Sequence, residues 1–257
     1  MEQKPKYYRI GSLEKGLRIV ELLSRQGTMS LSDIAGELKL DRSVCHRHLL
    51  TLRDMGLVSQ PGGSGYRLTM ALFEMAMRLV NRLEVKQVVR PFMEKLAATH
   101  GETVNLGIKD GSEVVYLDKC ESTHLLRAEL AVGTRIPMHC TALGKAILAF
   151  RPENERKVFC GAGGFKAYTD RTITSAKALA LELAGIRQQG FAVDDEEHFL
   201  GLRCVAAPLV DYTGFANYAL SIAAPESRLS PGRLTEIGVD LKRTCERISG
   251  TLGEIRT

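Results

Sequence analysis

Three short helical patterns followed at once by a glycine-rich turn constrain the fold of this chain more than any other feature. They are "SLEKGLRIVELLSRQG" (12–27), with apolar residues at 13, 17, 20 and 23, "SLSDIAGELKL" (30–40) and "DRSVCHRHLLTLRDMG" (41–56). Each begins with a residue that commonly caps a helix. The predicted caps are Ser12, Ser30 and Asp41, and the predicted stops are Gly27 and Gly56. Two short helices, a tight turn and a third helix predict a helix-turn-helix.

The segment that follows decides which subtype of helix-turn-helix this is. "LVSQPGGSGYRLT" (57–69) has two short alternating segments around Pro-Gly-Gly-Ser-Gly, which predicts a β-hairpin. A hairpin directly after the third helix is the wing of a winged helix. We therefore predict a winged helix-turn-helix domain over residues 9–69.

The excess positive charge of the chain lies almost entirely in this first part. Residues 1–70 carry 11 Lys and Arg against 7 Asp and Glu, whereas residues 71–257 carry 24 against 23. A small basic module joined to a nearly neutral body is typical of a protein that binds a polyanion.

The third helix raises a choice between a metal site and a nucleic-acid surface, because Cys45 and His48 are spaced i, i+3. At about 100° per residue, these two share a stripe with Leu49 and Leu52, the pattern of a face that packs on a core. A thiol on that face behaves as a small apolar group. Structural zinc needs four ligands, and neither neighbouring helix supplies a Cys or His. We therefore predict no metal site.

The opposite face of the third helix carries polar and basic side chains. Arg suits guanine edges or phosphate, and Ser and His suit phosphate or base edges. The alternative is a solvated charged face on an ordinary helix, which the hairpin and the charge asymmetry disfavour. The predicted DNA contacts are Arg42, Ser43, Val44, His46 and Arg47 of the helix and Arg67 of the hairpin. Lys4, Lys6 and Arg9 are further candidates, although any cation outside the helix could equally be an ordinary surface residue.

After the hairpin the pattern is helical, and then it changes to strands. We predict a linker helix over residues 70–86 and a second helix over about 87–99, with Pro91 in its first turn. Asp110-Gly111 lies between two alternating segments and predicts a hairpin. Further strand-like runs alternate with helical patterns. The fold class predicted for residues 87–257 is therefore α+β, with a mixed, largely antiparallel sheet.

The second module lacks common enzyme motifs and contains parts of a ligand pocket instead. There is no G-x-S-x-G, P-loop or H-E-x-x-H sequence. The helix start in "PMHCTALGKA" (137–146) offers free N–H groups, which suit a carboxylate. Asp194, Cys204 and Ser221 add polar groups, and "LLRAEL" (125–130) adds apolar walls. Such a pocket binds a ligand without turnover, although the thiol could equally be inert and the aspartate a turn residue.

A cysteine-dependent enzyme with an accessory winged-helix module is the alternative function. Its nucleophile would be Cys204 or Cys140, close to His139. His139 and Cys140 are adjacent, and on a strand adjacent side chains point to opposite faces, which argues against a catalytic pair. We therefore predict that the protein is not an enzyme and has no cofactor.

Composition favours a reducing, aqueous compartment. The 257 residues include six Cys without a C-x-x-C pair, which suits reduced thiols. No apolar run is long enough to cross a bilayer, and no apolar segment follows the first charged residues to mark the chain for export. We therefore predict a cytoplasmic protein without a membrane partner.

Four stretches, in order and spanning nearly the whole chain, resemble the IclR-type transcriptional regulators: "RSVCHRHLLTLRDMGLV", "GTRIPMHCTALGKAILA", "DDEEHFLGLRCVAAPLVDYTG" and "ALSIAAPESRLS". The resemblance implies a winged-helix domain, a linker helix and a GAF/PAS-like effector-binding domain. It also implies a homodimer or dimer of dimers on palindromic operators of double-stranded DNA, controlled by a small carboxylate effector. Repression of a catabolic operon is the expected default.

The resemblance also implies an effector pocket. Carried over position by position, it consists of Leu125, Ala128, Ala142, Leu143, Asp194, Cys204, Ser221 and Ala223. Members that bind very small keto acids have Ser and Gly where this chain has Ala223 and Ala142, and Leu143 is bulkier than the residue often found there. A lost hydroxyl removes a hydrogen-bond partner. The comparison therefore argues against glyoxylate or pyruvate as the effector.

Overall fold

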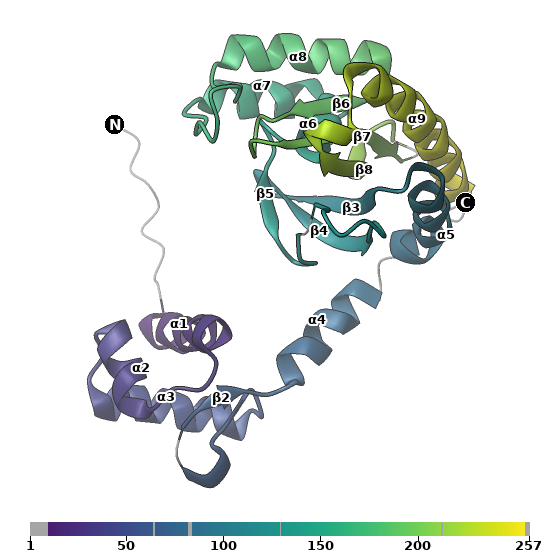
Figure 1. The fold of residues 1–257 in the computed structure, drawn as a ribbon. Coiled ribbons are helices and arrows are strands. Elements are labelled where there is room, and N and C mark those ends of the chain that lie inside the picture. The colour runs from purple at the N-terminus through teal and green to yellow at the C-terminus, as the bar shows by residue number, and fades with distance from the viewer. Residues whose placement is uncertain (1–9, 64, 82–83, 129, 212, 255–257) are drawn as a thin grey trace, which may run out of the picture. The chain divides into compact units, whose positions relative to one another are not determined.

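The computed structural model describes residues 10–254 apart from residues 64, 82–83, 129 and 212. The chain divides into two compact units, residues 1–82 and 83–257, and each is described by itself (Figure 1). The candidate DNA contacts Lys4, Lys6 and Arg9 lie outside the described residues.

The first unit contains three short helices, a two-stranded hairpin and a fourth helix. Its elements are α1 (Gly11–Gln26), α2 (Leu31–Leu38), α3 (Arg42–Asp54), β1 (Val58–Ser59), a 3-10 turn (Pro61–Gly63), β2 (Arg67–Leu68) and α4 (Ala71–Asn81). The two strands pair antiparallel, with Val58 opposite Leu68. This confirms the predicted winged helix-turn-helix, and α4 covers much of the segment predicted as the linker helix.

Local sequence explains where the helices of the first unit begin and end. The Ser30 hydroxyl accepts a hydrogen bond from the Asp33 N–H at 3.2 Å and donates one to the Asp33 carboxylate at 2.7 Å. This pair caps α2 as predicted. Gly27 and Gly56 follow α1 and α3 with φ of 76° and 73°, a region that glycine enters without a steric penalty.

Helix α1 differs from its prediction in two respects. Gly11 is already helical, so the prediction that Ser12 caps the helix is wrong. Leu13 and Leu17 are exposed, because they line an apolar groove together with residues of α3 and α4 instead of entering the core. The buried residues of α1 are Ile19 and Leu23.

The second unit is a six-stranded sheet with helices on both faces. Its elements are α5 (Glu84–His100), β3 (Thr103–Asp110), β4 (Glu113–Cys120), β5 (Arg135–Pro137), α6 (Ala142–Ala149), α7 (Glu153–Ala162), α8 (Ala176–Gln189), β6 (Ala192–Asp195), β7 (Leu202–Val210), β8 (Ala216–Pro225) and α9 (Pro231–Glu254). The strand order is β5-β4-β3-β8-β7-β6, and every pairing among the described residues is antiparallel. The predicted α+β class with a largely antiparallel sheet is confirmed.

Helix α5 begins earlier than predicted. Its first residue is Glu84, so Pro91 lies inside the helix and not in the first turn. Proline has no N–H, and the helix therefore lacks one backbone hydrogen bond there. Val85 and Val89 are buried in the core of the second unit. Their packing holds the upstream segment in the helix despite the proline.

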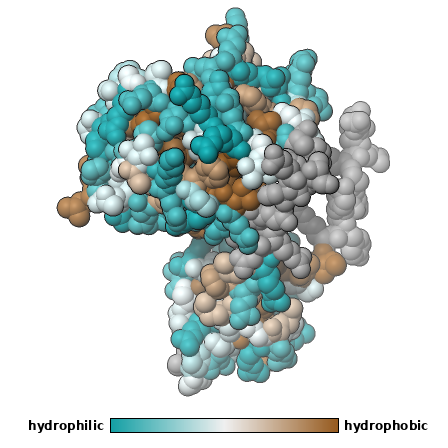
Figure 2. Space-filling model, turned by 90° about the vertical axis from the view of Figure 1, so that its right-hand side faces the viewer, coloured by the Kyte–Doolittle hydropathy of each residue, from teal (hydrophilic) through white to brown (hydrophobic). Residues whose placement is uncertain are grey.

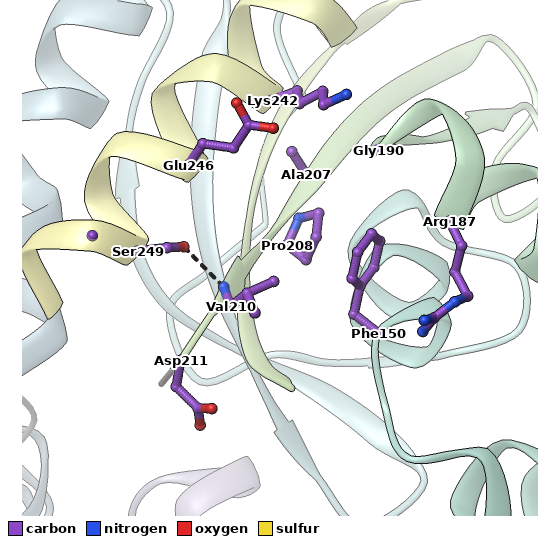
Figure 3. A pocket seen from close by; sticks show the side chains of 11 residues that line it. Phe150, Arg187, Gly190, Ala207, Pro208, Val210, Asp211, Lys242, Glu246 and Ser249 are labelled. Atoms are coloured by element: carbon purple, nitrogen blue, oxygen red, sulfur yellow. Dashed lines mark hydrogen bonds between the residues drawn. The ribbon is translucent and has the colours of Figure 1, made fainter. Parts of the chain in front are cut away.

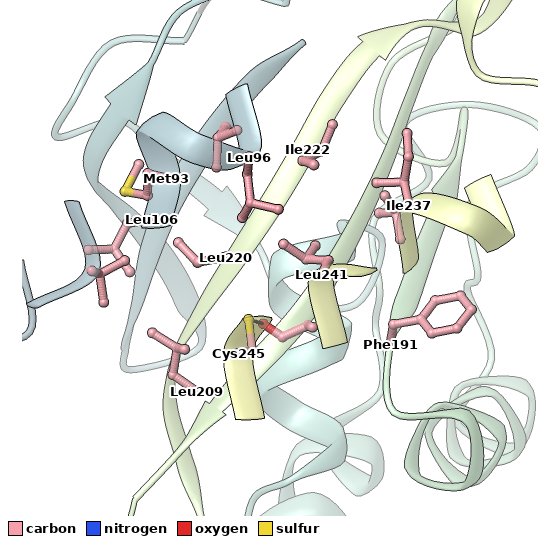
Figure 4. Packing of buried hydrophobic residues seen from close by; sticks show 14 of the residues in the cluster. Met93, Leu96, Leu106, Phe191, Leu209, Leu220, Ile222, Ile237, Leu241 and Cys245 are labelled. Atoms are coloured by element: carbon pink, nitrogen blue, oxygen red, sulfur yellow. Dashed lines mark hydrogen bonds between the residues drawn. The ribbon is translucent and has the colours of Figure 1, made fainter. Parts of the chain in front are cut away.

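Strand alternation gives the sheet two faces with separate cores. On one face, residues such as Leu106, Leu220 and Ile222 pack against α5 and α9 (Figure 4). On the other, the small residues Ala206 and Ala219 lie against α6 and its neighbours. The face under α6 also carries the positions on β6, β7 and β8 that the sequence analysis singled out.

Hydrophilic residues cover most of the described surface visible in Figure 2, with apolar residues in smaller patches. None of the described helices has both the length and the apolar character needed to cross a bilayer.

Candidate functional site

The N-terminal half of α3 presents the side chains predicted to contact DNA. Those exposed are Arg42, Ser43, His46 and Arg47, and Val44 is half-buried. Cys45 and Leu49 are completely buried on the opposite face. The helix therefore has the orientation predicted from its periodicity, with its arginines outward and its thiol inward.

Arg67 places a further cation on the hairpin. It lies on β2 opposite Ser59 and is exposed. No acidic side chain among the described residues forms an ion pair with Arg42, Arg47 or Arg67. These guanidinium groups are thus available to phosphates or base edges.

The Cys45–His48 pair does not extend to a metal site. Burial raises the pKa of the Cys45 thiol, which disfavours the thiolate that a metal needs. Among the described residues, no three His, Cys, Asp or Glu side chains come together so as to hold a metal ion.

In the second unit, strand register brings four predicted effector residues together. Asp194 of β6 lies opposite Cys204 of β7, which lies opposite Ala223 of β8. Ser221 is two residues before Ala223 and points to the same face of the sheet. Asp194 and Ser221 are each only 2% exposed. The row crosses three strands that follow one another in the chain, β6, β7 and β8.

Helix α6 covers these positions with its first turn. Thr141 is the N-cap, and its hydroxyl accepts a hydrogen bond from the Gly144 N–H at 3.2 Å. A Cβ at Gly144 would lie 2.3 Å from the Cα of Met138, so only glycine allows this close approach. Ala142 and Leu143 form the buried first turn, where backbone N–H groups have no acceptor within the helix.

Two predicted effector residues do not belong to these strands or to α6. Leu125 is fully exposed, and Ala128 is half-buried; both belong to the segment between β4 and β5. The residues that the structure brings to one region are Ala142, Leu143, Asp194, Cys204, Ser221 and Ala223.

Two polar side chains that the sequence analysis missed share the same face. Asn105 of β3 lies directly opposite Ser221, and Tyr116 of β4 lies opposite Gly107. Both are buried, and no described residue forms a hydrogen bond with the Asn105 amide or with the Tyr116 or Ser221 hydroxyl. The fully enclosed side-chain atoms without a partner among the described residues are Arg127 Nε and Glu197 Oε2, so the polar atoms of Asn105, Tyr116 and Ser221 keep some accessible surface that a ligand can reach. The alternation of β3 held a signal, because Asn105 interrupts an otherwise apolar strand.

Asp194 is buried without a cation of its own. Its Oδ1 accepts a hydrogen bond from the Glu197 N–H at 2.8 Å. Burial raises the pKa of Asp194 to about 7, and the charge of Glu197 acts in the same direction. Backbone N–H groups and Lys145 oppose this shift without cancelling it.

Lys145 of α6, only 1% exposed, is the nearby cation, but it is already paired. Its ammonium lies 2.9 Å from Glu182 Oε1 and also contacts Glu197 Oε1. Burial acts to lower the pKa of Lys145, but the two carboxylates outweigh it and raise that pKa above its usual value. The ammonium therefore stays charged. Glu197 Oε2 has no hydrogen-bond partner among the described residues.

Comparison with known proteins identifies the family. The model of the IclR helix-turn-helix domain matches residues 12–62, and the model of the bacterial transcriptional regulator IclR C-terminal domain matches residues 77–250. The chain belongs to the IclR family of bacterial transcriptional regulators. The predicted family, fold class and role in transcription regulation are confirmed.

Individual IclR relatives align over almost the whole chain. Transcriptional repressor IclR of Escherichia coli K12 is 33% identical over 96% of this chain and 92% of that protein. The crystal structure of the Thermotoga maritima IclR is 30% identical, covers 95% of this chain and 100% of that one, and has a TM-score of 0.82. An IclR homolog from Microbacterium hydrocarbonoxydans, solved with 4-hydroxybenzoate, shares the fold at 23% identity and a TM-score of 0.80, over 94% of this chain and 98% of that one.

The thiols of this IclR-family protein do not resemble catalytic nucleophiles. Burial raises the pKa of Cys140 to about 12, helped by Asp194, and burial raises the pKa of Cys204 well above its usual value. His139 Nε2 lies 3.0 Å from the Lys166 carbonyl oxygen, and no described imidazole forms a hydrogen bond with a thiol. The geometry gives no support to the alternative of a cysteine-dependent enzyme.

We expect iodoacetamide to modify Cys140 and Cys204 slowly at pH 7 in the folded protein and rapidly after unfolding. The thiolate is the reacting species, and burial keeps its fraction small at that pH. Peptide mapping by mass spectrometry over time measures both rates. Modification of either thiol in the folded protein as fast as that of a free cysteine would contradict this expectation and revive the enzyme alternative.

A pocket on the surface of the second unit lies among other residues. It has a volume of about 540 Å³ and is lined by residues of α8, α9 and β7 and by Phe150 (Figure 3). The Arg187 guanidinium lies 5.5 Å from the centre of the Phe150 ring. Lys242 and Glu246 add charges of opposite sign. None of the predicted effector residues lines this pocket.

Proposed function

We propose that this IclR-family regulator binds a palindromic operator through α3 and the β1–β2 hairpin and represses a catabolic operon until a small carboxylate binds under α6. The observation that carries the effector site is the group of buried, unpartnered polar side chains beneath the first turn of α6. Asn105, Tyr116 and Ser221 all belong to that group.

The DNA-binding part of the proposal rests on the exposed half of α3. We assign base and phosphate contacts to Arg42, Ser43, Val44, His46 and Arg47, and a backbone contact to Arg67. A winged helix reads one half-site, so a palindromic operator calls for two copies of the chain. We therefore propose a homodimer or dimer of dimers, with residues 9–69 as the DNA-binding domain, 70–86 as the linker and 87–257 as the effector-binding domain.

The effector part of the proposal assigns roles within the buried group. The Ser221 and Tyr116 hydroxyls and the N–H groups at the start of α6 donate to the ligand carboxylate. Leu143 and Ala223 form its apolar wall. The relative solved with 4-hydroxybenzoate supports a carboxylate as the ligand class. Ligand binding changes operator affinity only if the site differs between the two arrangements of the winged domains.

We expect at least one acid among pyruvate, 4-hydroxybenzoate and gluconate to raise the melting temperature of the protein and to change its affinity for the promoter of its own gene. Thermal-shift and gel-shift titrations measure the two effects. Ser221→Ala is expected to reduce the response to that acid by about tenfold or more, because hydrogen bonds to charged groups contribute about 1.5–3 kcal/mol.

Ser230→Ala is the matched control, since Ser230 precedes α9, which packs on the opposite face of the sheet from α6. It should leave the response unchanged. If no acid of any of the three classes changed either quantity, the effector part of the proposal would fail, while footprinting of a defined palindrome would still judge the DNA-binding part.

A further inference from the structure

We propose that the effector carboxylate binds together with one proton, which is held by the Asp194 carboxyl group. The inference rests on the effector site proposed above and concerns what that site demands of its ligand. It makes operator control by a carboxylate depend on pH.

Among the described residues, the cation that acts on Asp194 and Glu197 is Lys145, and it already has partners. Lys145 is already bound by Glu182 and Glu197, at 2.9 Å from the first and in direct contact with the second. Asp194 is a third acid, and it forms no ion pair with any described residue. An ionised ligand would add a fourth negative charge beside one ammonium in a buried site, where like charges repel strongly. A proton on Asp194 removes this repulsion.

Protonated Asp194 also gains a function that the carboxylate lacks. A neutral carboxyl group donates its O–H, and a hydrogen bond from O–H to an ionised carboxylate is short and strong. Its Oδ1 keeps the hydrogen bond from the Glu197 N–H. The ligand thus finds a donor on β6 as well as the Ser221 hydroxyl of β8 and the Tyr116 hydroxyl of β4.

Asp194 changes charge near neutral pH, with a pKa of about 7. Burial raises the pKa of the facing Cys204, Tyr116 and Cys140, so these stay protonated. Lys145 stays charged beside Glu197, whose pKa burial raises against the pull of that ammonium. Burial lowers the pKa of His198 to about 4, and it also lowers that of His139, so both stay neutral.

The sign of the effect follows from linkage. Only the protonated form of Asp194 accepts the ligand, so affinity is constant below its pKa and falls as pH rises through it. From pH 6 to pH 8 the dissociation constant of an acid such as 4-hydroxybenzoate should rise about tenfold. The acid itself is ionised throughout this range, so its own titration does not contribute.

Calorimetric titration of the wild-type protein with pyruvate, 4-hydroxybenzoate and gluconate at pH 6, 7 and 8 tests the proposal directly. Buffers of different ionisation enthalpy report the protons taken up on binding. We expect uptake of about one proton at pH 8 and much less at pH 6. The corresponding amides, which carry no charge, should show neither proton uptake nor loss of affinity at high pH.

Asp194→Asn keeps the size and the acceptor of the side chain but cannot titrate. Its affinity for the acid should be independent of pH and should exceed that of the wild type at pH 8. Asp195→Asn is the matched control, because Asp195 is its neighbour on β6 but pairs with Arg203 and Arg171 at the surface. This variant should keep the pH dependence of the wild type.

The outcomes separate the two proposals. Binding of an acid with the same affinity at pH 6 and pH 8 and without proton uptake overturns the role of Asp194 and leaves the effector site standing. Absence of binding by every acid at every pH overturns both. The titrations of the wild-type protein at the three pH values test the role of Asp194 even if Asp194→Asn fails to fold.

Discussion

Arg47→Ala is expected to weaken binding to the operator by about 1–3 kcal/mol, or roughly 5- to 150-fold. Arg47 is exposed in the N-terminal half of α3, on the face opposite the buried Cys45. No described acid competes for its guanidinium. In the proposed operator complex, Arg47 donates two parallel hydrogen bonds to a guanine edge in the major groove, and alanine leaves that edge without a partner.

Fluorescence anisotropy with the operator and with a random duplex, at one fixed salt concentration, distinguishes the kinds of contact. Loss of a base contact lowers the preference for the operator over the random duplex. Loss of a phosphate contact weakens binding to both duplexes and reduces the salt dependence of binding. Arg53→Ala is the matched control, because Arg53 is exposed in the last turn of the same helix. If Arg47→Ala and Arg53→Ala lost the same preference for the operator over the random duplex, Arg47 would no longer count as a base contact.

Lys145→Met is expected to lower the free energy of unfolding by about 3–5 kcal/mol, the range measured when one partner of a buried ion pair is removed. Methionine fills a similar volume but leaves the buried Glu197 without its ammonium partner. Glu182 is less affected, since its side chain is 36% exposed. Urea denaturation of the full chain, followed by circular dichroism, measures the change.

The loss in free energy of unfolding caused by Lys145→Met should also depend on pH. Without Lys145, the buried Glu197 is less costly in the folded protein when it is protonated. The pKa of Glu197 in the folded state therefore rises further above its value in the unfolded state. A raised carboxyl pKa makes stability fall as pH rises. Lys145→Met should therefore lose more stability relative to wild type at pH 8 than at pH 5.

Lys157→Met is the control for the buried pair. Lys157 forms an ion pair with Glu153 at 2.6 Å, but its side chain is 75% exposed. Exposed pairs contribute about 0–1 kcal/mol, so this variant should change stability little. Similar losses of stability for Lys145→Met and Lys157→Met would show that the buried pair stabilises the fold no more than an exposed one.

Much of the first unit could be predicted from the sequence because its determinants are local. Ser30 and Asp33 cap α2 through atoms three residues apart, and a helical period is enough to place Cys45 inside and Arg47 outside. The failures are local patterns that tertiary packing overrode. Leu13 lines a groove instead of the core, and Pro91 sits inside α5 because residues before it are buried.

The arrangement under α6 was decided by tertiary structure. Asp194, Cys204 and Ala223 form a row through the register of three consecutive strands, which depends on how the connecting loops fold and on which residues pack on each face. Lys145 meets partners 37 and 52 residues away, so its burial as an ion pair has no local signature. The sequence by itself determined the helices, the hairpins and the inward and outward faces, because these depend on neighbours along the chain. Which acids and hydroxyls share one buried site depended on strand order, which only the folded sheet defines.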